Sequence, residues 1–503
     1  MVVINSIANY SGQFVQIVLN ICVTPLYLVF LGSEAYGLIG FLMLMQGWVL
    51  LLDLGLSPTL GRQVAAARSQ NNGFNFFRKL LKSFEVIIYL ISIVIALFFV
   101  IANSWISDVW INSDNLPIED VEYCLSIIGM ILGLRLILVL YRSGIIGLED
   151  QVWLNLMNIL ISIIRFVGGI CFVYFISRDV KDFFSYQLIV SVIELTVFCI
   201  RFYSILPKDN SNISLISFHL DAVKKVAPFS LSIAWTAGLW VLLTQADKLV
   251  LTSTLSLEEV GYLSIVVLIA NGILMAAFPI SQAVQPQLVR LFSLNKVTEM
   301  ISLYRKSTQF QVLFSMSLAL FVVNFSFPLL YVWLANEIAA KWISEVLTWF
   351  VLGNAILVIS GVQYSLQVAH GDLDLHWKGT TFISMINIPT AIFFAYYYGP
   401  LAAGITWFSF RLVWGLIWTW IVHKKFAPKL HLTWLINDVL LIVLPITLVT
   451  IIFANIFDFS IDQERFKLAI KLFFCLISII FLSSFSLRIV RSYFLTLFRI
   501  NQA

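Results

Sequence analysis

Four charged side chains stand inside long apolar runs, where they could do chemistry in a membrane. Arg135, Arg165, Arg411 and Glu194 each fall near the middle of such a run. A charge at the centre of a bilayer is costly, so each of these groups needs a polar partner or a water-filled cavity. Three arginines face a single glutamate, and arginine stays protonated and can bind phosphate or carboxylate through two parallel hydrogen bonds. The sequence therefore predicts a cationic site for an anionic substrate at mid-membrane depth.

Arg165 extends a polar stripe. Asn155, Asn158, Ser162 and Arg165 are spaced by three and four residues, so they share one side of a helix. The stripe indicates a water-accessible interior. An alternative is that Arg165 and Glu194, at similar depth on consecutive antiparallel spans, only pair to hold two helices together. Even with that pair formed, the arginines outnumber the glutamate.

A second polar face lies near the start of the chain. Its residues recur at steps of three and four in an otherwise apolar run, so they share one helix face that cannot look at lipid. We expect this face to look into a gap between two halves of the protein. The residues of this face are Asn9, Gln13, Gln16 and Asn20. The predicted substrate-binding set is therefore Arg165, Arg135, Arg411, Asn155, Asn158, Asn9, Gln13, Gln16 and Asn20.

Carboxylates in the apolar runs are candidates for ion coupling, because a half-buried carboxylate can change its protonation near neutral pH and arginine cannot. The candidates are Asp53, Glu194 and Asp247, the last beside Lys248. For Asp247 and Lys248, a local salt bridge is an equal alternative.

No metal or cofactor is expected. The segment from His370 to His376 holds two histidines and two carboxylates, but the two histidines are six residues apart and not at the helical i, i+4 spacing of a zinc motif. The sequence has no G-x-x-x-x-G-K-S/T run to cradle nucleotide phosphates. Any transport must then be driven by a gradient or by the supply of the substrate.

The composition is that of an integral membrane protein. Of 503 residues, 60% are hydrophobic and 12% are charged, where a soluble protein has about a quarter charged. Apolar runs of about 20 residues predict an all-α fold with about fourteen spans. Lys and Arg concentrate in alternate connections, which places both termini in the cytoplasm and the acidic connection 105–123 outside. The net charge of +4 is spread over these connections and does not indicate nucleic acid.

A weak internal repeat divides the chain. A shift of about 225 residues lays the turn at Glu34 on Glu259 and the basic segment after Arg62 on residues 290–306. Both copies begin inside and six spans separate them, so the repeat has the parallel topology of two transporter halves. We expect two pseudo-symmetric six-helix lobes and two further helices. The predicted boundaries are 1–208, 209–430 and 431–503.

Two stretches carry a resemblance to a known family. The first holds PLY at 25–27, LGSEAYG at 31–37 and LDLGL at 52–56, followed by the basic segment. The second holds QADKLVL at 245–251 and EVGY at 259–262. Both stretches resemble Wzx-type O-antigen flippases, polysaccharide exporters of the superfamily shared with multidrug exporters and lipid II flippases. The two last predicted helices exceed the number that many members have, which leaves their role open.

The resemblance implies a function. It implies a V-shaped pair of lobes that moves an undecaprenyl-diphosphate-linked oligosaccharide, such as an O-antigen repeat unit, between leaflets of the bacterial inner membrane by alternating access. It implies membrane lipid, an O-antigen polymerase and a chain-length regulator as partners, and no enzyme activity. The expected direction is from the cytoplasmic to the periplasmic leaflet, in lipopolysaccharide biosynthesis.

Two alternatives remain. A multidrug or metabolite antiporter of the same superfamily would share the fold, but an arginine-rich midplane should repel cationic drugs. A membrane-embedded polysaccharide polymerase or glycosyltransferase needs catalytic groups on a sizeable outer loop or a soluble domain. The connection 105–123 is too short to supply either.

Overall fold

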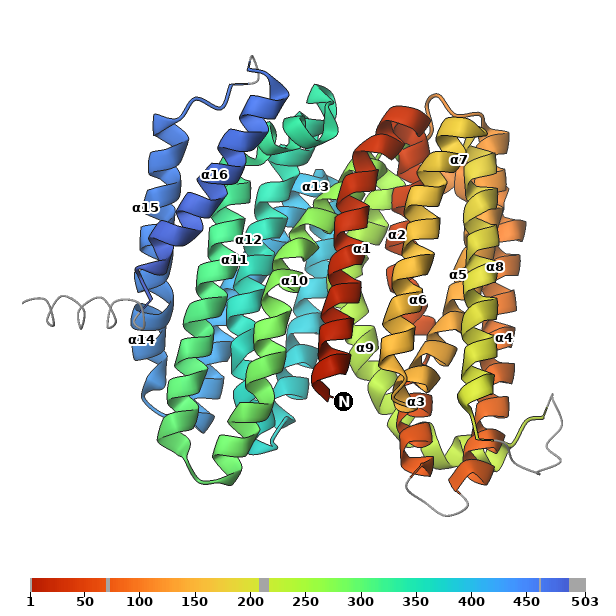
Figure 1. The fold of residues 1–503 in the computed structure, drawn as a ribbon, viewed down its shortest axis with the longest axis horizontal. Helices are drawn as coiled ribbons and strands as arrows, with labels where there is room; N and C mark the ends of the chain where they lie inside the picture. Colours follow the sequence, from red (N-terminus) through yellow and green to blue (C-terminus); the bar gives the residue numbers. More distant parts are fainter. Residues whose placement is uncertain (1, 69–72, 208–216, 461–462, 488–503) are drawn as a thin grey trace, which may run out of the picture. The chain divides into compact units, whose positions relative to one another are not determined.

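The computed structural model describes residues 2–68, 73–207, 217–460 and 463–487, with side chains placed at all of these except 2–11, 13, 14, 50 and 73. Regular structure in these ranges is helical, and the described residues form no β-strand beyond one isolated bridge between Asn112 and Ser256. The helices of the first half are α1 (Val2–Leu31), α2 (Ser33–Leu52), α3 (Leu56–Ala67), α4 (Gly73–Trp105), η1 (Ile106–Trp110), α5 (Ile118–Gly147), α6 (Gln151–Ile163), η2 (Ile164–Gly168), α7 (Gly169–Phe175), α8 (Val180–Ile205) and α9 (Leu220–Thr254) (Figure 1). Those of the second half are α10 (Leu257–Ser293), α11 (Val297–Leu334), α12 (Glu337–His370), α13 (Asp374–Phe426), α14 (Leu430–Trp434), η3 (Leu435–Leu440), α15 (Leu441–Ile456) and α16 (Arg465–Ser484).

Eleven helical stretches within the described residues are long and apolar enough to cross a membrane. Some combine several elements, since η1 continues α4, η2 joins α6 to α7, and η3 joins α14 to α15. One stretch, α13, covers two predicted spans, because Gly399 breaks its helical geometry with φ 76° and ψ −166° just before Pro400. With α1 and α2, these elements account for the fourteen predicted spans. The all-α membrane fold is therefore confirmed.

The chain folds into two compact units, Met1–Ser264 and Ile265–Ala503. In the first unit α5 packs against α4 and α8, α3 lies against α5, α1 runs along α6, and α2 runs along α9. In the second unit α12 packs against both α11 and α13, and α15 and α16 both pack on α11. The boundary falls inside α10, so the first unit includes α9. The division into lobes at residues 208 and 430 stays a prediction.

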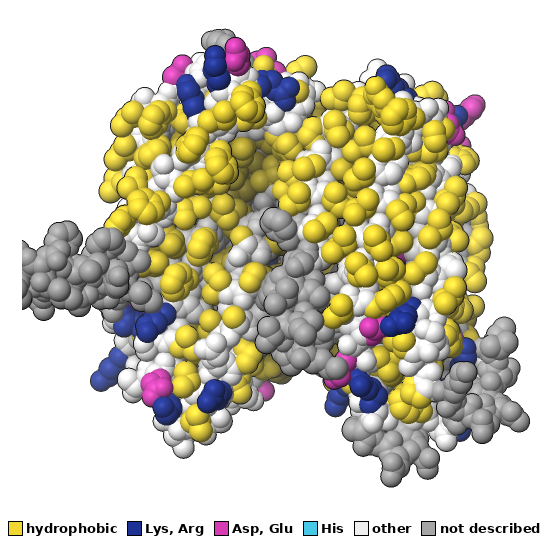
Figure 2. Space-filling view, viewed as in Figure 1, with side chains coloured by type: hydrophobic (Ala, Val, Ile, Leu, Met, Phe, Trp, Pro, Cys, Tyr) yellow, Lys and Arg dark blue, Asp and Glu magenta, His cyan; other side chains and the backbone are white. Residues whose placement is uncertain are grey.

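The outer faces of the helices are apolar. On α4 the exposed side chains recur at steps of three and four residues and form one stripe. These residues are Leu90, Ile93, Val94, Leu97, Phe98 and Ile101. On the face seen in Figure 2, hydrophobic side chains cover the middle of each unit and most charged ones lie toward the ends. Such a surface belongs in lipid, and the chain is a multi-pass membrane protein.

Candidate functional site

A cavity of about 420 Å³ lies in the first unit among α1, α2, α5, α6, η2 and α8. Its volume is in the range of small-molecule sites, enough for a phosphorylated headgroup. Its lining combines apolar residues with polar and charged ones. The polar lining residues include Gln16, Asn20, Tyr27, Gln46, Arg135, Arg142, Ser162, Arg165, Gln187 and Glu194.

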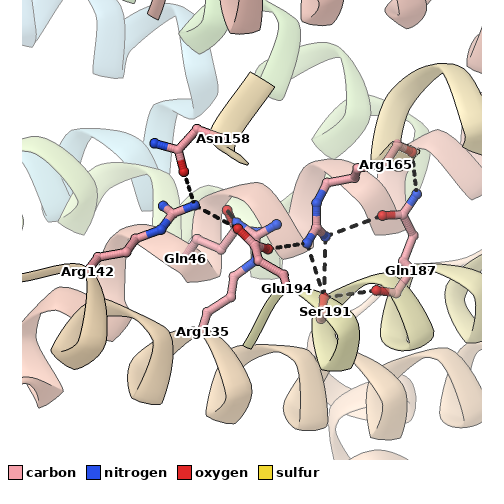
Figure 3. Close-up of polar contacts among 8 residues, drawn as sticks. All are labelled: Gln46, Arg135, Arg142, Asn158, Arg165, Gln187, Ser191 and Glu194. Carbon is pink, nitrogen blue, oxygen red and sulfur yellow. Dashed lines mark hydrogen bonds and ion pairs between the residues drawn. The ribbon is translucent and has the colours of Figure 1, made fainter. Parts of the chain in front are cut away.

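Glu194, on α8, is the centre of this polar set. It is buried, and its two carboxylate oxygens accept hydrogen bonds from different arginines (Figure 3). Arg142 Nη2 donates to Oε1 at 2.6 Å, and Arg165 Nη2 donates to Oε2 at 2.7 Å. These are charge-assisted bonds in a buried setting, which are stronger than the same bonds in water. One carboxylate thus ties α5 and η2 to α8.

The guanidinium of Arg165 has hydrogen-bond partners on α8 in addition to Glu194. Its Nη1 donates to Gln187 Oε1 at 3.4 Å, and both terminal nitrogens lie 3.3 Å from Ser191 Oγ. It stands in η2, a π-helical turn, a rare conformation that is often found at functional sites.

Side chains from neighbouring helices bind the backbone carbonyls of η2. Tyr27 on α1 donates to Phe166 O at 3.1 Å, and Tyr186 on α8 donates to Ile164 O at 2.6 Å. Gln187 Nε2 donates to the carbonyl oxygen of Arg165 itself at 3.2 Å. The carbonyl oxygens of the π-helical turn can accept hydrogen bonds from side chains of other helices. The three bonds hold the backbone at Arg165 in position.

Two further arginines reach the cavity from α5. Arg135 and Arg142 are seven residues apart, about two helical turns, so they share one side of the helix. Arg135 Nη1 donates to Gln46 Oε1 on α2 at 2.7 Å, and Arg142 Nη2 also donates to Asn158 Oδ1 at 2.8 Å. Within the described residues Arg135 forms no ion pair, and its buried Nε has no hydrogen-bond partner. With one glutamate among three arginines, two formal positive charges are left without a counter-ion in the set.

The structure places the predicted substrate-binding residues in three groups. Gln16, Asn20, Arg135 and Arg165 line the cavity, and Asn158 holds Arg142 there. Asn155 is buried where α6 meets α1, with its Nδ2 donating to Gln151 O at 2.7 Å and its Oδ1 only 2.8 Å from where a Cβ on Gly12 would lie. Arg411 lies in the second unit, on α13, with its guanidinium 4.1 Å from the centre of the Trp407 ring. The side chains of Asn9 and Gln13 lie outside the described residues.

The candidates for ion coupling differ in their surroundings. Asp53 directly follows α2 and is buried, and its carboxylate accepts hydrogen bonds from the N–H of Ser57, in the first turn of α3, at 3.2 Å and from the Ser57 hydroxyl. Lys248 Nζ lies 3.1 Å from the Asp247 carboxylate, and both residues are buried. The local salt bridge between them is therefore present. Among these carboxylates, Glu194 is the one that lines the cavity.

Sequence reasoning missed Arg142. It lies near the end of α5, which continues to Gly147. Its seven-residue spacing from Arg135 was the available signal. Among the described residues, no group of three His, Cys, Asp or Glu side chains could hold a metal ion.

Comparisons with known proteins agree on the fold. A family model described as polysaccharide biosynthesis protein matches residues 2–292. The lipid II flippase MurJ in an inward closed conformation is similar with a TM-score of 0.67, at 16% identity over 96% of this chain and 98% of that one. An inward-facing MATE multidrug resistance transporter of the MOP superfamily has a TM-score of 0.66, at 12% identity over 82% and 96% of the two chains.

A third solved structure, a MOP superfamily transporter from Pyrococcus furiosus, has a TM-score of 0.56 at 15% identity, over 84% of this chain and 95% of that one. That transporter is described as having a binding pocket of reverse polarity, which suggests a different function for it. No curated protein matches the chain. At these identities the likeness is one of fold, and the fold is that of MOP superfamily transporters.

Proposed function

We propose that this chain, which belongs to the polysaccharide biosynthesis protein family, is a flippase for an undecaprenyl-diphosphate-linked oligosaccharide such as an O-antigen repeat unit. The observation that carries the proposal is the set of three arginines around one buried glutamate. A transporter fold with a cationic cavity suits an anionic lipid headgroup.

The charges of the cavity and of the headgroup match. Each phosphate of a diphosphate that links a lipid to a sugar keeps one acidic oxygen, so the group carries two negative charges. The three arginines and Glu194 together carry two positive charges. Arg135 has no carboxylate partner in the described part of the chain and can offer its guanidinium to phosphate oxygens. The amides of Gln16, Asn20 and Gln46 can bind sugar hydroxyls nearby.

The positive charge of the cavity favours this proposal over a multidrug exporter of the same superfamily. A multidrug exporter of organic cations would have to place its cargo beside two uncompensated positive charges, which repel it. The enzyme alternative, a polymerase or glycosyltransferase, has no support from the solved structures with this fold, which are transporters.

The transport step would be alternating access in the bacterial inner membrane, with the prenyl chain remaining in lipid while the headgroup crosses. The lobes would be residues 1–208 and 209–430, both termini would be cytoplasmic, and an O-antigen polymerase and chain-length regulator would receive the product. Arg411 would then bind the anionic headgroup in the second lobe, as Arg135 and Arg165 would in the first.

Binding to purified protein tests the proposal. The full chain in lipid nanodiscs is titrated with farnesyl diphosphate and with tetraphenylphosphonium, a diphosphate lipid and an organic cation. We expect the diphosphate to bind, and Arg135→Ala to weaken its binding at least ~10-fold, because a charged hydrogen-bond donor is lost. Arg201→Ala is the matched control, since Arg201 pairs with Asp150 outside the cavity lining. Binding of the cation in preference to the diphosphate would contradict the proposal.

A further inference from the structure

We infer that Glu194 is a positioning residue that competes with substrate phosphate for Arg142 and Arg165, and so sets how tightly the cavity holds and releases an anionic headgroup. The inference rests on the proposed function. Among the described residues that line the cavity, Glu194 is the one acidic residue, and the inference assigns to it a role opposite in sign to that of the arginines.

Glu194 binds the two arginines in the way that a phosphate would, with a different oxygen on each guanidinium. Its two oxygens accept from guanidinium nitrogens on two different helices, at 2.6 Å from Arg142 and 2.7 Å from Arg165. A phosphate also presents several oxygens to arginine forks. An incoming phosphate can therefore take over the bonds that the carboxylate makes.

Each arginine has neutral partners that can hold it while it changes its anionic partner. Arg142 also donates to Asn158, and Arg165 also lies against Gln187 and Ser191. Exchange of the carboxylate for a phosphate thus leaves neither guanidinium without hydrogen bonds.

The two arginines differ in their freedom to move. The side chain of Arg142 is 33% exposed, whereas those of Arg165 and Glu194 are 9% and 7% exposed. Arg165 is further fixed by its place in η2, whose carbonyls are held by Tyr27, Tyr186 and Gln187. Arg142 is therefore the arginine that transfers from Glu194 to the substrate, and Arg165 stays with the carboxylate longer.

A carboxylate that competes with the substrate for the arginines can help a transporter to release its substrate. Binding must be favourable enough to admit the substrate and weak enough to release it. Without the Glu194 charge, the set would carry three positive charges against the two negative charges of the headgroup. The cavity would then hold a diphosphate more tightly and release it more slowly.

Glu194→Gln tests the inference, because it removes the charge and keeps the shape and one acceptor. In nanodiscs, we expect farnesyl diphosphate to bind the variant about tenfold or more tightly than the unchanged protein. In proteoliposomes, translocation of a prenyl diphosphate-linked sugar should show a lower KM and a lower kcat. A purely structural role would instead lower affinity and thermal stability together. Asp150→Asn is the matched control, because it removes a carboxylate that pairs with Arg201 outside the cavity lining.

Several outcomes decide the matter. Unchanged or weaker diphosphate binding by Glu194→Gln, at unchanged Tm, would overturn the inference while leaving the proposed function intact. If Glu194→Gln does not fold, Glu194→Asp takes its place, because its shorter side chain cannot reach both arginines. It should bind the diphosphate more tightly than the unchanged protein, and equal or weaker binding overturns the inference. If the unchanged protein binds no diphosphate, the proposed function itself fails.

Discussion

Glu34 and Asn115 are joined by three hydrogen bonds although 80 residues separate them in the chain. The backbone N–H of Asn115 lies 2.9 and 3.0 Å from the two Glu34 oxygens, and its side-chain Nδ2 lies 2.6 Å from Oε1. The N–H of Leu116 donates to the same carboxylate at 2.8 Å. Glu34, at the start of α2, thereby fixes the connection between η1 and α5.

Glu34→Ala should destabilise this connection, because it leaves several backbone N–H groups, which are only partly buried, without their acceptor. We expect a loss of about 2–4 kcal/mol in the free energy of unfolding, from more than one bond to a charged group. Hydrogen exchange should quicken at residues 114–116. Glu119→Ala, in the first turn of α5 just after this connection, is the control, since Glu119 is exposed. Equal exchange rates in Glu34→Ala and Glu119→Ala would show that Glu34 does not hold the connection.

The first turn of α5 also gives a test of topology. If both termini are cytoplasmic, as proposed, cysteine at Glu119 should react with a membrane-impermeant maleimide added outside the cell, and cysteine at Lys224 should not. Both positions are exposed in the structure. The five native cysteines are first replaced by serine, since Cys22 and Cys171 are exposed. Labelling at Lys224 and protection at Glu119 would reverse the orientation.

Gly37 allows α2 to cross the start of α10 at very short range. A Cβ at this position would lie 1.9 Å from the carbonyl oxygen of Leu257, so the two backbones could not keep their distance. Gly37→Ala should lower the free energy of unfolding by about 1–3 kcal/mol. Gly272→Ala, in open space on the same α10, should stabilise the helix by up to about 1 kcal/mol. Thermal unfolding of both variants measures the difference, and equal Tm values would contradict the close crossing.

Much of this molecule follows from its sequence, and the exceptions have physical causes. Long apolar runs predict helices reliably, because in lipid every backbone group must be bonded within its own segment. The meeting of Arg165 with Glu194 was foreseeable from their equal depth on consecutive spans. Arg142 was not, because it lies near the end of α5, where hydropathy does not mark the boundary.

The polar stripe on α6 was predicted with a uniform helical period, and the structure departs from it. Ser162 and Arg165 line the cavity and Asn158 binds Arg142 there, so three of the four residues of the stripe meet at the cavity. Asn155 instead packs near Gly12 of α1, and Arg165 stands in the π-helical turn η2. No residue type marks a π-helical turn in advance, because side chains from other helices stabilise it.

In the second unit, Asp438 should be essential for stability. It is fully buried in η3 and accepts from Gln309 Nε2 at 2.6 Å and from Arg305 Nη2 at 3.0 Å, both on α11. Asp438→Ala leaves Arg305 without its counter-ion and should cost about 3–5 kcal/mol. Arg305→Leu combined with Asp438→Leu should recover part of that loss, because no charge is then left unpaired. Thermal unfolding measures each variant, and additive losses in the double variant would rule out a direct interaction.

Variants of Arg165 distinguish a role in protein stability from a role in transport. In Arg165→Ala, Glu194 still has Arg142 as its partner, so the carboxylate is not left alone and protein abundance should stay close to normal. If the proposed function is right, export of O-antigen should nevertheless fall strongly, because one of the three proposed cationic contacts to the diphosphate is lost. Arg165→Lys keeps the charge but loses the fork, and it should retain part of the export. Abundance by immunoblot and O-antigen on the cell surface are measured in a strain lacking its own flippase. Full export by the double variant Arg165→Ala, Glu194→Ala would mean that the arginine serves only to neutralise Glu194, and it would remove Arg165 from the substrate site.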